Sequence, residues 1–275
     1  MSMVKKLFPV VNESGYQEKG KDIWSAAVVK DEYGKYRMFA TRCSDFLKNS
    51  TKNAEIVLAT TEDIDTPFVF DKVVIPNGHN PSVIKAGGKY LLYYSGNDGD
   101  IYCAVSNSAD GDFTVPSAPI ALPFKAYSPS AVTDNHGNIR LFVRDYEKRV
   151  FIFEATSYDG KYTAIRENIL HLGKVEDFCV HRVNFGYNMI ALDTEGMYGG
   201  LKNAGSIFRS ADGLYWHPGS PVLAYDFSVS YTDGTSLTVD RREHPFIFTE
   251  DGVKYLFTSV TSGERVWNMV QKLGL

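Results

Sequence analysis

Ten residues with chemically useful side chains stand in five pairs, each at the start of a segment that has the pattern of a β-strand. The pairs are Trp24/Ser25, His79/Asn80, Tyr127/Ser128, Glu176/Asp177 and Glu243/His244. Carboxyl and imidazole groups can exchange protons, and amides, hydroxyls and aromatic faces can hold a polar ligand. If the five pairs meet in space, they form a ligand site equipped for acid–base chemistry.

The pairs recur at equivalent places in a sequence repeat. In residues 79–96, a strand starts at the polar pair, the Gly87-Gly88 turn follows, and an aromatic second strand completes the unit. The corresponding turn glycines of the five copies are Gly34, Gly88, Gly137, Gly186 and Gly252. Their spacings are 54, 49, 49 and 66 residues. Periods near fifty residues, built from short strands without an intervening helix pattern, indicate the blades of a propeller.

We therefore expect an all-β fold, a five-bladed β-propeller with four antiparallel strands per blade, as a single domain over residues 1–275. The blades are expected at about residues 13–76, 77–123, 124–172, 173–233 and 234–273. Residues 4–12 are strand-like but lie outside the repeat, and we expect them to close the last blade. Because the first strand of each propeller blade lines the central channel, the five polar pairs should converge at one mouth.

Three copies of Ser-x-Asp-Gly occupy one place in the repeat. They begin at Ser108, Ser157 and Ser210. Asp and Ser side chains in such a motif bond local backbone amides, and glycine adopts the positive φ of the turn. These carboxylates are therefore interpreted as structural.

Composition limits the class of partner. The formal net charge is −4, from 29 basic and 33 acidic residues, and the chain has no basic run, which argues against binding nucleic acid or an anionic membrane. No apolar run approaches a membrane span, and the N-terminus lacks the apolar stretch of a signal peptide, so a cytoplasmic location is expected. Cys43, Cys103 and Cys179 have no metal-binding spacing and are expected to be buried free thiols.

Two segments of the sequence resemble a known superfamily. Residues 80–94 read Asn-Pro-Ser-Val-x-x-x-Gly-Gly-Lys-Tyr-x-Leu-Tyr-Tyr, and residues 210–216 read Ser-x-Asp-Gly-x-x-Trp. These patterns are similar to those of the five-bladed propeller glycosidases, which include glycoside hydrolase families 43, 32, 68, 117 and 130. The resemblance covers the whole chain as a repeat, and it implies the fold more specifically than the reaction.

The resemblance implies that Glu176 is the general acid, because it lies at the position of the acid that opens blade four in families 43 and 32. Ser25 and Ser128 depart from the pattern, since each stands where an Asp is expected. Asp22, three residues upstream of the first gap, and Asp177, beside the acid, are the candidate replacements. Segments 191–196 and 240–245 resemble a less studied branch similar to family 43, and Asp193 is assigned to substrate binding.

Glycosidic bond cleavage needs two carboxyl groups, because a proton must reach the leaving oxygen while a base or nucleophile acts on the other face of the sugar. Glu176 with Asp22 or Glu243 would meet this requirement. Trp24 and Tyr127 offer flat apolar faces to a sugar, and the candidate partners of its hydroxyls are His79, Asn80, Arg242 and His244. Trp24 is equally consistent with a core aromatic, and Arg241 and Arg242 with ion pairs to Glu243 or Asp240.

We expect the partner to be a small saccharide or an oligosaccharide, with neither cofactor nor metal, because His79 and His244 on separate blades are a weak signal for a metal site. A glycoside hydrolase acting on a small sugar or a chain end is the first hypothesis. A sugar-binding propeller without catalysis is the alternative, motivated by Ser25 and Ser128. A protein-binding scaffold ranks last, because the Gly-His and Trp-Asp signatures of interaction propellers are missing. No pattern in the sequence points to a particular oligomer.

Overall fold

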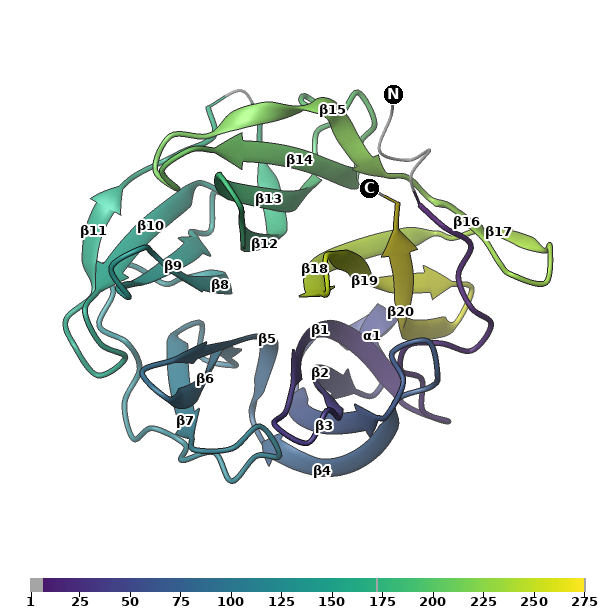
Figure 1. Cartoon of the computed structure of the whole chain (residues 1–275), viewed down its shortest axis with the longest axis horizontal. Helices are drawn as coiled ribbons and strands as arrows, with labels where there is room; N and C mark the ends of the chain where they lie inside the picture. The colour runs from purple at the N-terminus through teal and green to yellow at the C-terminus, as the bar shows by residue number, and fades with distance from the viewer. Residues whose placement is uncertain (1–6, 172, 275) are drawn as a thin grey trace.

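The computed structural model describes residues 7–171 and 173–274, which form five antiparallel sheets arranged around a common axis (Figure 1). The first three sheets consist of β1 (Asp22–Lys30), β2 (Tyr36–Cys43), β3 (Glu55–Thr61) and β4 (Val69–Ile75); β5 (Gly78–Ala86), β6 (Lys89–Gly96) and β7 (Ile101–Ser106); and β8 (Tyr127–Thr133), β9 (Ile139–Arg144), β10 (Val150–Ala155) and β11 (Thr163–Arg166). The last two consist of β12 (Val175–Val183), β13 (Gly186–Asp193), β14 (Ala204–Ser210) and β15 (His217–Tyr225); and β18 (Arg241–Glu250), β19 (Val253–Ser262) and β20 (Arg265–Leu273). The predicted five-bladed propeller is confirmed, and the first strand of every sheet is the innermost.

Four strands per blade is right for three blades and wrong for the second and fifth, which have three strands each within the described residues. In the second blade, a single bridge between Val105 and Thr114 stands outside β7. In the fifth, Leu7 bridges Leu273 of β20 in the antiparallel sense. Residues 7–10 thus lie where the closing segment is expected, while residues 4–6 of that segment lie outside the described residues.

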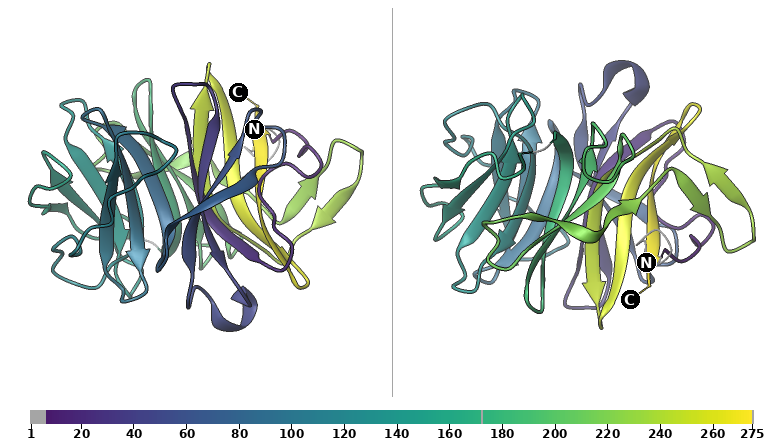
Figure 2. Two further views of the ribbon diagram at one scale, coloured as in Figure 1. Left: turned by 90° about the horizontal axis from the view of Figure 1, so that it is seen from below. Right: turned by 90° about the horizontal axis from the view of Figure 1, so that it is seen from above.

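Two small elements interrupt the repeat. The four-residue helix α1 (Phe46–Asn49) follows β2. A hairpin of β16 (Ser228–Ser230) and β17 (Ser236–Thr238) extends sideways from the fifth blade (Figure 2). This hairpin accounts for the longest spacing in the repeat, since it lies between the fourth and fifth blades along the chain. No helix within the described residues is both long enough and apolar enough to cross a membrane.

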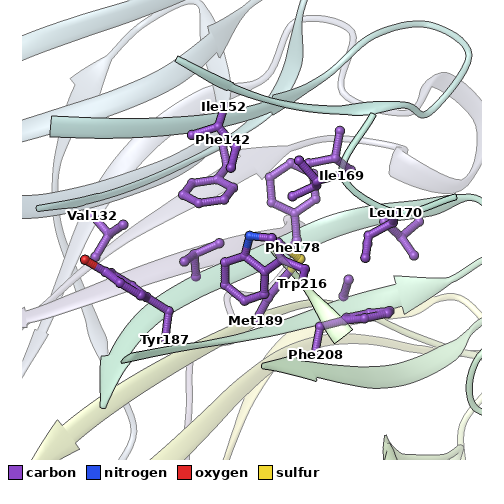
Figure 3. Packing of buried hydrophobic residues seen from close by; sticks show 14 residues of the cluster. Val132, Phe142, Ile152, Ile169, Leu170, Phe178, Tyr187, Met189, Phe208 and Trp216 are labelled. Atoms are coloured by element: carbon purple, nitrogen blue, oxygen red, sulfur yellow. The ribbon is translucent and has the colours of Figure 1, made fainter. Parts of the chain in front are cut away.

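The hydrophobic core is divided among the interfaces between neighbouring blades. In the interface of the third and fourth blades, Phe142 of β9 meets Trp216 edge to face, with ring centroids 5.8 Å apart (Figure 3). Met189 and Phe208 of the fourth blade are fully buried in the same cluster. Burial of one such side chain is worth about 1.5–3 kcal/mol, so each interface stabilises the ring substantially.

Short side chains on the inner strands tie successive blades together. Ser82 Oγ accepts a hydrogen bond from the Ala131 amide at 3.0 Å, and Ser130 Oγ accepts one from the Val180 amide at 2.9 Å. Cys179 takes the same place in the fourth blade, where its sulfur accepts the Ile247 amide at 3.4 Å. All three cysteines are buried and free, as predicted. The sulfur of Cys179 also takes part in the hydrogen bonds that join neighbouring blades.

The turn interpretations are confirmed in part, since Gly111 and Gly213 of the Ser-x-Asp-Gly copies have a positive φ and Gly160 does not. Gly186 joins β12 to β13 with φ 108°, and a Cβ there would lie 2.2 Å from the Ser210 carbonyl oxygen, which requires glycine. In the Ser-x-Asp-Gly turn of the fourth blade, Asp212 Oδ1 accepts the amides of Leu214 and Tyr215 at 2.8 and 3.0 Å. Asp212 therefore serves the turn.

Candidate functional site

A cavity of about 740 Å³ opens at one end of the propeller axis. Its lining comes from all five blades and includes the first residue of every polar pair: Trp24, His79, Tyr127, Glu176 and Glu243. Below it, a much smaller cavity of about 30 Å³ is lined by the five inner strands alone. A space of several hundred Å³ at the end of a closed channel is of the size that small-molecule ligands occupy.

A β-bulge in every inner strand brings the pairs to this place. The second residue of each pair has a positive φ: 29° at Ser25, 53° at Asn80, 52° at Ser128, 48° at Asp177 and 49° at His244. At each of these positions the register to the neighbouring strand shifts. Since a residue with a side chain is strained in this region of φ, five such residues on one ring indicate a constrained part of the fold.

Four of these bulge residues form a hydrogen-bonded chain across the channel. Asn80 Nδ2 donates to Ser128 Oγ at 3.4 Å, and Ser128 Oγ donates to Asp177 Oδ1 at 3.2 Å. The other carboxyl oxygen of Asp177, Oδ2, lies 3.2 Å from His244 Nε2. Asp177 is thus bound on both oxygens at the floor of the cavity.

Burial shifts the pKa values of Asp177, His244 and His79. It raises the pKa of Asp177 from 3.8 to about 7, with the nearby Glu176 carboxylate adding to the effect. Burial lowers the pKa of His244 from 6.5 to about 4. Near pH 6, Asp177 is consequently protonated and His244 is neutral, so the contact between them is a neutral hydrogen bond and not an ion pair. His79 is neutral for the same reason, since burial lowers its pKa to about 4.

Glu176 is held by two cations. Its Oε2 lies 3.0 Å from Arg144 Nη2 and its Oε1 lies 2.5 Å from Lys148 Nζ. Both cations come from the third blade, Arg144 at the end of β9 and Lys148 in the loop before β10. They compensate the charge of Glu176, which suits a group that acts as a carboxylate.

Glu243 lies on the fifth blade with a cation of its own. Arg241 donates to both carboxylate oxygens, each at 2.8 Å. The guanidinium also lies over the rings of Trp24 and Phe46, with distances to the centroids of 5.0 and 5.4 Å. The ion-pair interpretation therefore holds for Arg241.

Trp24 packs as a core aromatic although it lies at the cavity wall. It is 2% exposed, and its ring stacks on Phe46 with the centroids 4.1 Å apart. Tyr127 is half-buried at the opposite part of the wall, and Arg144 lies over its ring at 5.1 Å. Of the two predicted sugar platforms, Tyr127 is the one with substantial exposed surface.

Three of the predicted site residues lie elsewhere. Asp22 is not among the residues that line the cavity, and its Oδ2 accepts the backbone amide of Phe46 at 2.6 Å. Arg242 is fully buried and donates to Gln271 Oε1 at 2.7 Å and Thr258 Oγ1 at 3.3 Å. Side chains alternate along a strand, so Arg241 and Glu243 face the cavity while Arg242 faces the blade interior.

Asp193 is the third predicted site residue that does not line the cavity. Its carboxylate is fully buried and accepts four backbone amides, at 2.8–3.1 Å. The donors are Gly196, Met197, Tyr198 and Gly199. Asp193 is not among the residues that line the cavity, but the loop that it organises supplies Thr194, Glu195, Lys202 and Asn203 to that lining.

Four of the basic residues at the site were not predicted from the sequence. Five cations line the cavity: Arg144, Lys148, Lys174, Lys202 and Arg241. Four of them lie at strand ends or in loops outside the repeat unit, so aligning the polar pairs could not reveal them. Arg241 had a usable signal, because it stands two residues before Glu243 on a strand and therefore on the same face. No group of three or more metal-ligating side chains occurs within the described residues.

No family model and no curated protein matches the sequence. Solved structures do. A thermostable family-43 glycoside hydrolase superimposes with a TM-score of 0.69 at 14% identity, over 96% of this chain and 93% of that one. A family 117 glycoside hydrolase from the marine bacterium Zobellia galactanivorans has a TM-score of 0.69 at 16% identity, over 97% and 88%.

A further neighbour was solved with a sugar. It is a family-43 β-xylosidase/α-arabinofuranosidase from a compost microbial metagenome in complex with xylotriose, with a TM-score of 0.66 at 13% identity, over 97% of this chain and 93% of that one. The chain therefore has the fold of the five-bladed propeller glycosidases. A shared fold does not define a reaction, which depends on the residues of the site.

Proposed function

We propose that the protein is a glycoside hydrolase that cleaves a glycosidic bond of a small saccharide or chain end bound in the cavity at the mouth of the propeller. The observation that supports this most is the convergence of three carboxyl groups on one cavity: Glu176, Asp177 and Glu243. The pKa of one of them, Asp177, is about 7, while the other two are held by cations. Carboxyl groups in different environments are what acid–base cleavage of a glycoside requires.

The environments favour particular roles. Asp177, protonated near neutral pH, is suited to donate a proton to the leaving oxygen, and His244 and Ser128 hold it in position. Glu176 or Glu243 supplies the base, since each forms an ion pair with an arginine. This differs from the role of general acid that the resemblance implies for Glu176, so the two assignments are alternatives for the same reaction.

The test is turnover of a panel of aryl-glycosides and oligosaccharides by the parent protein and three variants. We expect Asp177→Asn to lower kcat by about 10²–10⁴-fold, the usual contribution of a general acid, with little change in saccharide affinity. Glu176→Gln and Glu243→Gln should identify the base by the same comparison. Glu154→Gln is the control, because Glu154 pairs with Arg140 outside the cavity. A parent protein that cleaves nothing in the panel would refute the proposal.

A second function is favoured by one observation. Ser25 and Ser128 occupy the same bulge position as Asp177 in the first and third blades, and both hydroxyls are engaged, Ser25 with Thr41 Oγ1 at 2.7 Å and Ser128 with Asp177. A propeller that binds sugars without cleaving them would need no carboxylates there. Saccharide binding by a parent protein without turnover would establish this alternative.

A further inference from the structure

The cavity wall formed by the third and fourth blades is basic. Arg144, Lys148, Lys174 and Lys202 line it, with Glu176 and Glu195 as the carboxylates on the same wall. We propose, on the basis of the glycosidase function above, that the substrate is an acidic saccharide whose anionic group, a carboxylate or a sulfate ester, binds this wall. We call these four cations the basic wall.

The charge of the cavity contrasts with that of the chain. Its lining has five cations and four carboxyl groups, one of which, Asp177, is about half protonated at pH 7. The chain as a whole has a formal net charge of −4. A cavity with an excess of positive charge, on a protein of negative net charge, favours ligands that carry negative charge.

The cations differ in what engages them. Arg241 is bound by both oxygens of Glu243, and Arg144 and Lys148 share Glu176. Lys174 and Lys202 are exposed, and neither has an ion pair within the described part of the chain. Glu195 lies close by, with its Oε2 accepting the backbone amide of Lys174 at 3.2 Å. An anionic substituent is the chemistry that these two lysines are free to bind.

Arg144 provides a second, independent sign of a ligand. Its Nη2 is bound to Glu176, but its Nε is buried without a hydrogen-bond partner. A buried donor without a partner costs free energy, and one on a guanidinium at the cavity indicates a group that a ligand oxygen satisfies. The charge of the guanidinium suits an oxyanion as that ligand.

A neutral sugar explains less of this geometry. A hydroxyl group would accept from Arg144 Nε, but it would leave Lys174 and Lys202 without a counter-charge. A carboxylate or sulfate at the basic wall meets both requirements. A hydroxyl-rich ring could then extend from the basic wall toward Asp177 and Glu243.

The experiment measures dissociation constants by calorimetry for two matched pairs of probes. The first pair is digalacturonate and its methyl ester, and the second is a sulfated galactose disaccharide and its desulfated counterpart. We expect the parent protein to bind one acidic probe at least about tenfold more tightly than its neutral counterpart, with the difference shrinking at high salt. Which pair shows the difference identifies the anionic group.

The decisive variant is Lys174→Gln/Lys202→Gln, which should lose most of the preference for the acidic probe and leave the affinity for the neutral one unchanged. Lys19→Gln/Lys161→Gln is the control, because it removes the same charge at two exposed sites that do not line the cavity. Equal binding of both members of each pair, no binding of any probe, or an unchanged preference in the decisive variant would overturn the inference.

Turnover of the same probes separates this inference from the proposed function. Binding of an acidic probe without cleavage would retain the ligand class and remove the hydrolase activity. Cleavage of neutral saccharides with no preference for acidic ones would do the reverse.

Discussion

At the scale of single residues, the contact between Asp177 and His244 is the centre of the site. Folding moves the proton affinities of the two groups in opposite directions, since burial raises the pKa of Asp177 to about 7 and lowers that of His244 to about 4. In the unfolded chain at pH 5, the imidazole is protonated and the carboxyl is ionised. The folded pair also binds one proton, but it is on the carboxyl group. Folding therefore relocates a proton within the pair with little net uptake.

This gives a pH prediction with a definite sign. Stability from Asp177 is fully present below pH 3.8 and is lost as the pH rises through 7, whereas stability from His244 is present above pH 6.5 and is lost as the pH falls through 4. Between pH 4 and 6.5 the two slopes oppose each other in the parent protein. Asp177→Asn leaves the His244 slope alone, so the variant should lose about 2 kcal/mol relative to the parent between pH 6.5 and 4.5.

Urea unfolding at pH 4.5 and 6.5 measures this difference. His244→Gln is the reciprocal variant, and its stability relative to the parent should fall as the pH is raised over the same interval. Measuring each variant against the parent removes the contributions of His79 and His181, which both proteins share. If both variants shift in the same direction with pH, the pair does not share one proton as described.

The residues also show what local sequence reasoning could reach. The polar pairs were found because each opens an inner strand, and the repeat gave them equivalent places. Asp22 and Arg242 were misplaced because the side of a strand on which a residue lies depends on the register and on the bulge, which a single sequence does not reveal. Arg241 and Arg242 are consecutive, yet Arg241 lies at the cavity and Arg242 is buried beside Gln271.

At the scale of elements, the loop between β13 and β14 is held in its conformation by the buried carboxylate of Asp193. Asp193 ends β13, and the loop residues that it binds through their amides lead to Lys202 and Asn203 at the cavity. Four charge-assisted hydrogen bonds to one side chain make this loop depend on a single residue. Its shape could not be predicted from the sequence, because the loop between the second and third strands differs from blade to blade, and in the first blade it contains α1 instead.

Asp193→Asn tests this dependence. The substitution keeps the size of the side chain but replaces an oxygen acceptor with a donor, which opposes backbone amide donors. We expect a loss of about 2–4 kcal/mol in the free energy of unfolding and weaker saccharide binding through the displaced loop. Chemical unfolding and calorimetric binding are the two measurements.

Asp212→Asn is the matched control for this prediction. Asp212 also accepts backbone amides, but it is exposed and lies at the opposite end of β14, outside the cavity lining. Its substitution should cost less than about 1 kcal/mol and leave saccharide affinity unchanged. Equal effects of the two substitutions on affinity would show that Asp193 does not position the wall.

At the scale of the whole molecule, the number of blades was predictable because every blade repeats the same strand pattern and turn glycine. The numbers of strands were less so. In the second and fifth blades, isolated bridges at Thr114 and Leu7 stand in the place of an outermost strand. The ring of five bulges was not foreseen, since Ser25 and Ser128 are not residue types that are enriched at positive φ.

Closure of the ring leads to the last prediction. Phe8 donates its amide to the Lys272 carbonyl at 3.0 Å, and Gln271 Nε2 donates to the Phe8 carbonyl at 2.7 Å. Val10 is buried, and its amide donates to the Ser230 carbonyl at 2.8 Å. The contacts of Phe8 cover part of the outer edge of β20, and that of Val10 attaches the segment to β16. An uncovered edge strand is a template for pairing with another chain.

Removal of residues 1–12 should therefore lower the thermal unfolding midpoint by several degrees and promote self-association, since a loss of about 1 kcal/mol shifts the midpoint of a chain of this size by about 2–4 °C. Removal of residues 1–6 alone is the control, because it keeps all the contacts of Phe8 and Val10 described above. Differential scanning calorimetry and light scattering distinguish the two. An unchanged midpoint and a monodisperse solution for the longer deletion would show that the edge of β20 is stable without its cover, and that the ring is closed by the packing between its blades.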